Sequence, residues 1–182
     1  MNRCRGLVAL LVVALAGLGL EGNVHAESTV ADDVLAKIAS AEASVANAKV
    51  AIKNGKTLVD MIPEDSPLLP EVAQMLKQVS INWKLAVASL ESAKESSAKI
   101  PMATSPELAA DYALLATVNA TVAETGANVV GLGLSYVEAV AKNKTESLDI
   151  IRNAMQDALA ASSQVKFNCD KVKNLISQKY SN

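Results

Sequence analysis

Hydrophobic and small residues recur at alternating steps of three and four along four successive long stretches of the chain. This spacing is typical of helices that bury one seam against each other. The four seams run over residues 34–62, 72–100, 108–140 and 148–176. Because the segments between them are short, neighbouring helices should run antiparallel. The sequence therefore predicts an all-α, antiparallel, up-down-up-down four-helix bundle with long, heptad-patterned helices.

Start and stop signals place these helices at approximately residues 29–62, 70–100, 106–142 and 144–179. Pro63 and Pro101 follow the first two seams, where a proline ends a helix. Ser105 precedes a proline and an acid, which is typical of a helix start. Asn143 with Glu146 three residues later resembles a capping box, so we expect the last helix to begin there.

The third predicted helix is apolar around most of its circumference, which favours contact with more than two neighbouring helices. The polar residues left over form one narrow strip, chiefly of Thr117, Thr121, Glu124, Asn128 and Glu138. Because these polar residues interrupt the apolar run, we do not expect the helix to span a membrane.

Small residues at steps of four form a ridge on the same helix: Ala123, Ala127, Gly131 and Ser135. Such a ridge allows another helix to approach closely, either inside the bundle or between two copies of the chain. Phe167 lies opposite the seam of the last helix, where an exposed aromatic ring can anchor a partner. These residues are the candidate interaction face for a protein partner or a homo-oligomer.

The single tryptophan, Trp83, falls at a level where the other helices present mostly small residues. Folding the seams back at the loops brings it level with Ala48, Val122, Gly126, Ala158 and Ser162. Trp83 either fills this layer as a large core side chain or borders a cavity for an apolar or amphiphilic small molecule.

The first 26 residues have the features of a cleaved secretory signal peptide. Two arginines precede an apolar run too short to span a membrane, and small residues before Glu27 suit cleavage. We therefore expect export to a periplasmic or extracellular location and one domain over residues 27–182. Cys169 is then the only cysteine left, so no disulfide can form within the mature chain, and its seam position favours a buried thiol.

Charge and missing residue types narrow the chemistry further. The chain has 17 basic and 19 acidic residues, and its lysines are scattered over all the helices, which argues against nucleic acid as a partner. The only histidine, His25, lies in the predicted signal peptide, and no haem, zinc or phosphate-loop motif is present. In size and helix number the chain resembles the periplasmic cytochrome bundles, but it matches none of their haem residues.

These observations predict no enzymatic activity, no cofactor and no metal. We expect an exported structural or interaction module that self-associates through the third helix or binds a protein partner. A carrier of a small apolar or amphiphilic ligand near Trp83 is the alternative.

Overall fold

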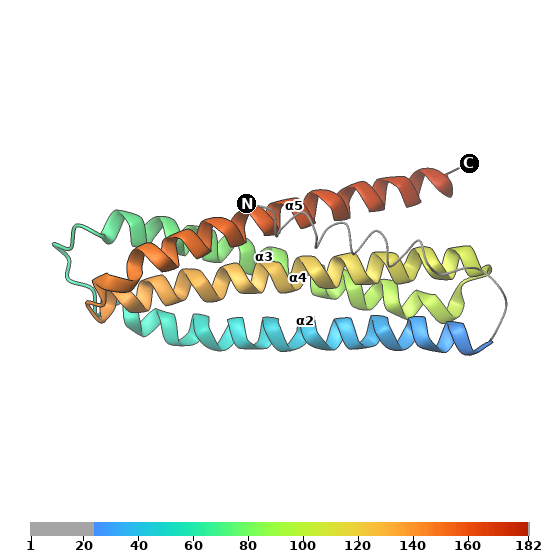
Figure 1. The fold of residues 1–182 in the computed structure, drawn as a ribbon, viewed down its shortest axis with the longest axis horizontal. Coiled ribbons are helices and arrows are strands. Elements are labelled where there is room, and N and C mark those ends of the chain that lie inside the picture. Colours follow the sequence, from blue (N-terminus) through green and yellow to red (C-terminus); the bar gives the residue numbers. More distant parts are fainter. Residues whose placement is uncertain (1–23, 182) are drawn as a thin grey trace. The chain divides into compact units, whose positions relative to one another are not determined.

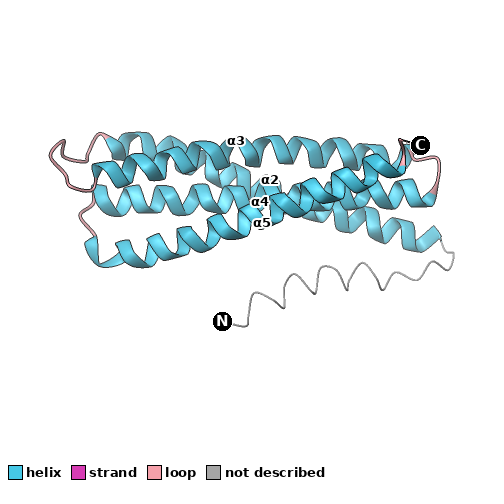
Figure 2. Ribbon diagram, turned by 90° about the horizontal axis from the view of Figure 1, so that it is seen from above, coloured by secondary structure: helices cyan, strands magenta, loops and turns pink. Residues whose placement is uncertain are grey.

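Four long helices and two short 3₁₀ turns make up the computed structural model, which describes residues 24–181 (Figures 1 and 2). The helices are α2 (Val24–Val59), α3 (Leu69–Lys99), α4 (Pro106–Ala141) and α5 (Leu148–Lys179), and the turns are η1 (Ile100–Met102) and η2 (Thr145–Ser147). The predicted all-α four-helix bundle is confirmed. The apolar run of the predicted signal peptide lies outside the described residues. The packing described below is that of the unit formed by residues 31–182.

Contacting residues give the relative directions of the helices. Val79 of α3 lies beside Gly133 of α4, whereas Ala86, farther along α3, lies beside Gly126, earlier on α4. α3 and α4 therefore run antiparallel. In Figure 1, where colour follows the sequence from blue to red, the direction of the colour change reverses from each long helix to the next.

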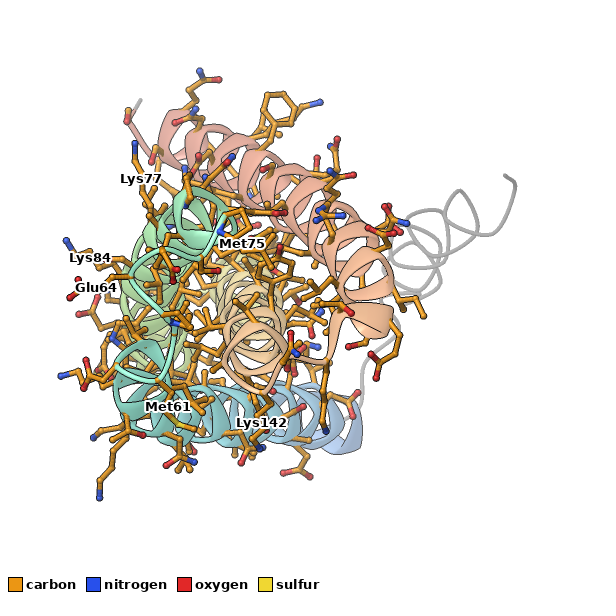
Figure 3. All side chains as sticks on the ribbon, turned by 90° about the vertical axis from the view of Figure 1, so that its left-hand side faces the viewer. Met61, Glu64, Met75, Lys77, Lys84 and Lys142 are labelled. Atoms are coloured by element: carbon orange, nitrogen blue, oxygen red, sulfur yellow. The ribbon has the colours of Figure 1, made fainter. Side chains whose placement is uncertain are left out.

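α4 is the central helix, because it packs against each of the other three (Figure 3). α4 buries fifteen residues, whereas α3 buries seven and α5 five. On the side of α2, Gly55 faces Leu134 so closely that an added Cβ would lie 2.6 Å from the leucine Cδ2. The wide apolar surface predicted for this helix is thus used in packing on three sides.

The predicted polar strip of α4 lies on the remaining, more open side. Thr117 and Thr121 are half-buried, and each hydroxyl donates to the carbonyl four residues earlier, at 2.9 Å. Asn128 is exposed, and Glu124 forms an ion pair with Lys37 of α2. The polar groups of this strip are therefore bonded within α4, paired with α2 or exposed to solvent.

The start of α4 follows the sequence prediction, since the Ser105 hydroxyl oxygen accepts a hydrogen bond from the Leu108 amide at 3.2 Å. The expected capping box at Asn143 is wrong. Asn143 has a φ of 53°, and the Lys144 amide donates to the Ala139 carbonyl at 2.8 Å. This left-handed residue closes the end of α4 in a Schellman arrangement, which asparagine tolerates better than most residues.

Three helix boundaries differ from the prediction, and the first is that α2 begins at Val24 instead of near residue 29. α5 begins at Leu148, after η2, because residues 143 and 144 complete the end of α4. α2 ends at Val59, because the amides of Met61 and Ile62 bond to carbonyls three residues earlier, at 3.1 Å each. Ile62 is nevertheless buried, so the first seam continues into this turn.

Arg152 of α5 joins three helices near the loops that carry Ile62 and Asn143. Its guanidinium donates to Glu71 of α3 through two bonds, at 2.6 and 3.1 Å, and lies 3.5 Å from the Tyr136 hydroxyl of α4. The hydrogen bond from Arg152 lowers the pKa of Glu71, whereas burial raises the pKa of Tyr136. The bidentate geometry fixes the relative positions of α3 and α5 at this end.

Replacing Gly133 by alanine should destabilise the fold. An added Cβ would lie 2.6 Å from Val79 Cγ2 and 3.2 Å from Met155 Cε, so buried side chains would have to move. We expect a loss of about 1–3 kcal/mol in the free energy of unfolding, measured by urea denaturation. Gly131 is the matched control, since an added Cβ there meets nothing within 4 Å. Gly131→Ala should stabilise the helix by about 0.5–1 kcal/mol, and equal effects of the two substitutions would contradict this packing.

The substitution Glu71→Gln should make the free energy of unfolding depend less steeply on pH in the acidic range. Because the folded-state pKa of Glu71 is lowered, its carboxylate stabilises the fold above the unfolded value of about 4.5. This stabilisation is lost as the pH falls through the lowered folded-state value. We expect the unaltered protein to lose more stability than Glu71→Gln on acidification, measured by urea denaturation at a series of pH values. Glu64→Gln, in an exposed loop, should retain the unaltered profile; an equally steep Glu71→Gln profile would argue against the ion pair.

Candidate functional site

The residues predicted to surround a ligand near Trp83 lie mostly in the core. Trp83 itself is half-buried, and neither of the two pockets described below is lined by it. The other members of the predicted layer are all buried: Ala48, Val122, Gly126, Ala158 and Ser162.

Asn82, rather than its neighbour Trp83, is the buried residue of α3 at this level. Its side-chain amide donates to the Gln78 carbonyl at 3.0 Å, and its Oδ1 accepts from the Ser162 hydroxyl of α5 at 3.4 Å. The backbone oxygen of Asn82 would lie 3.1 Å from a Cβ added at Gly126. The close approach of α3 and α4 at Gly126 thus brings Asn82 and Ser162 together in one buried layer.

A groove opens between α3 and α5 beyond this layer. Between Asn82 and the start of α3, the two helices are connected by the ion pair of Glu71 with Arg152 and share the core around Met75 and Met155. On the other side they leave a pocket of about 190 Å³ whose floor is the buried Val122 of α4. Its walls carry Leu85, Ala88, Ser89 and Ser92 of α3 and Lys166, Cys169, Asp170 and Lys173 of α5.

Some polar groups of this groove have partners within the protein, and others have none among the described residues. Lys166 forms an ion pair with Asp170 at 2.5 Å, so these two charges balance. Lys173 is half-buried and makes no ion pair with the described residues. The hydroxyls of Ser89 and Ser92 likewise make no hydrogen bond within the described part of the chain. The groove therefore offers one ammonium group and two hydroxyls beside an apolar floor.

Cys169 closes the bottom of the groove on the α5 side. Its thiol is buried and donates to Oδ1 of Asn119 on α4 at 3.4 Å, while the Asn119 amide donates to the Leu115 carbonyl at 2.7 Å. Burial raises the pKa of the Cys169 thiol, although the nearby Lys173 ammonium opposes this shift. A protonated thiol is a weak nucleophile, so Cys169 serves here as a structural hydrogen-bond donor.

The predicted interaction face does not form one continuous surface. Ala123 and Ala127 are buried within the bundle, whereas Gly131 is half-buried and Ser135 is exposed on the open side of α4. Phe167 lies on α5 and is 65% exposed. Close packing inside the bundle accounts for the two alanines, and Phe167 remains the large apolar member of this set that is exposed to a partner.

A second pocket, of about 180 Å³, lies between α4 and α5 near the C-terminal end of α5. Asp111 of α4 binds this end, because its Oδ2 accepts from the Lys179 ammonium at 2.7 Å and from the Tyr180 hydroxyl at 2.8 Å. The hydrogen bond to Asp111 raises the pKa of Tyr180. The second pocket is lined by Asp111, Leu114, Val172, Leu175, Ile176 and Lys179.

Sequence patterns could not identify the groove, because a seam names the residues that face inward but not where two helices separate. The run of small residues Ala88, Ser89, Ser92 and Ala93 on α3 was the available signal. Only the three-dimensional structure shows that Ser89 of α3 and Lys173 of α5 line the same groove as Val122.

The described residues contain no group of three or more histidine, cysteine or acidic side chains that could hold a metal ion. Within the same part of the chain, no helix combines the length and apolar character needed to cross a bilayer. Comparison with protein-family models, with curated proteins and with solved structures finds no match to this chain.

Proposed function

We propose that this protein is an exported, non-enzymatic interaction module that presents α5 to a protein partner. The observation that carries the proposal is that α5 is packed less extensively than α4 and keeps large apolar side chains exposed. It buries only five residues, while Ile150, Phe167 and Leu175 are 72%, 65% and 57% exposed. Large apolar side chains on an exposed helix are typical anchors of protein interfaces.

α5 fits this role better than the small-residue ridge of α4. Ala123 and Ala127 are covered by the protein's own helices, so a partner could reach them only if the bundle opened. α4 also exposes none of the large hydrophobic side chains found at the described surface. A partner that docks on α5 needs no rearrangement of the core.

The residue types of the chain support a binding role rather than catalysis. The only histidine lies in the predicted signal peptide, so the mature domain would lack the most common general base. The buried thiol of Cys169 is engaged with Asn119, and its raised pKa disfavours the thiolate. The alternative of an apolar ligand beside Trp83 is less well supported, because Val122 is the one member of the predicted layer that lines a pocket and Trp83 lines neither of the two.

A photo-crosslinking amino acid at position 167 should capture a partner in the native host. Leu35 is the matched control, because it is also apolar and 57% exposed but lies on α2. We expect discrete crosslinked products from position 167 and none above background from position 35, detected by immunoblotting and mass spectrometry. Equal products from the two positions, or none from position 167, would contradict a docking role for α5.

Export should leave Glu27 as the first residue of the protein isolated from its host. The apolar run followed by small residues before position 27 is the basis of this expectation. Cell fractionation and intact-mass measurement would test it. Recovery of the uncleaved chain in the cytoplasm would refute export while leaving the α5 interaction to be judged by crosslinking.

A further inference from the structure

The groove between α3 and α5 has the size of a small-ligand site. Drug-sized ligands occupy pockets of about 300–1,000 Å³, whereas this groove measures about 190 Å³. A buried apolar cavity of about 150 Å³ is enough to hold benzene. A single ring or a short hydrocarbon chain, with one polar group, therefore matches the space.

The shape of the groove gives such a ligand an apolar end. Val122 is buried at the floor, and Leu85 and Ala88 form the α3 wall. Because Val122 is already buried, a ring or chain in the groove would remove from water mainly the apolar surface of Leu85 and Ala88, which favours binding. The apolar part of the ligand would thus point toward α4.

The charges of the groove select the polar end. Because Lys166 is balanced by Asp170, the ammonium of Lys173 leaves the groove with one excess positive charge. Ser89 and Ser92 on the opposite wall add hydroxyl donors. One cation and two hydroxyls match a carboxylate, which only accepts hydrogen bonds and carries one negative charge.

We infer that the α3–α5 groove binds a small organic carboxylate, with its apolar part against Val122 and its carboxylate held by Lys173 and the two serine hydroxyls. This site goes beyond the proposed protein interaction and does not depend on it, because Phe167 does not line the groove. The class includes aromatic acids of the size of benzoate and short-chain fatty acids.

Benzoate, titrated into the isotope-labelled protein at low salt and followed by NMR, tests this site. We expect saturable shifts of the Val122, Leu85 and Ala88 methyl signals, with a dissociation constant in about the millimolar range, as suits a ligand with few contacts. Benzamide has the same ring without the charge and should bind at least about fivefold more weakly. No saturable shift at these methyls, or equal binding of benzamide, would overturn the inference.

Two pairs of variants separate the groove from the rest of the surface. Lys173→Met should weaken benzoate binding about fivefold, whereas Lys171→Met, on the exposed side of α5, should not change it. Ala88→Leu fills the groove from an exposed position and should abolish binding, whereas Ala73→Leu on the same helix should not. Unchanged unfolding temperatures would show that the fold is intact. Unaltered binding to Lys173→Met and Ala88→Leu would place benzoate elsewhere and refute the site.

Discussion

A helix surrounded by three others must be apolar or small around most of its circumference, and the rest of this fold depends on how α4 meets that requirement. Gly126 and Gly133 let α3 approach so closely that even a methyl group would touch it, and Gly55 of α2 accommodates Leu134 of α4 in the same way. At such short distances between helices, dispersion contacts are dense although the side chains are small. Stability then rests on close backbone approach more than on large side chains.

Where small residues pack closely, few large side chains interlock to fix the register of one helix along another. In this fold, buried polar pairs fix that register. Asn119 with Cys169 joins α4 to α5, and Asn82 with Ser162 joins α3 to α5. Sliding α5 by one turn would separate both pairs and leave buried polar atoms unsatisfied, which is costly. The described residues contain no buried side-chain nitrogen or oxygen without a partner, in accord with a single register.

Much of this fold could be predicted because periodicity and helix-end chemistry are local properties. The four helices, the cap at Ser105 and the wide apolar surface of α4 follow from residues close together in the chain. Two features could not be predicted, because they depend on distant neighbours. Asn82 is buried instead of Trp83 because Gly126 and Ser162 provide space and a hydrogen-bond partner there. Asn143 ends α4 rather than starting α5, because asparagine suits both a helix start and a left-handed helix end and the residue type alone does not decide between them.

The site differs from the predicted one for a related reason. The sequence indicates that α4 has an unusually wide apolar surface, but most of that surface is buried against the other helices of the bundle. The exposure of α5 follows from the same arrangement. With α4 occupied by three helices, α5 attaches along one line of buried residues, from Leu148 through Met155 and Ser162 to Cys169. A helix held along one line leaves both flanks open, and the two pockets lie along its C-terminal half. The crowding of α4 is thus the structural cause of the accessible surfaces on α5.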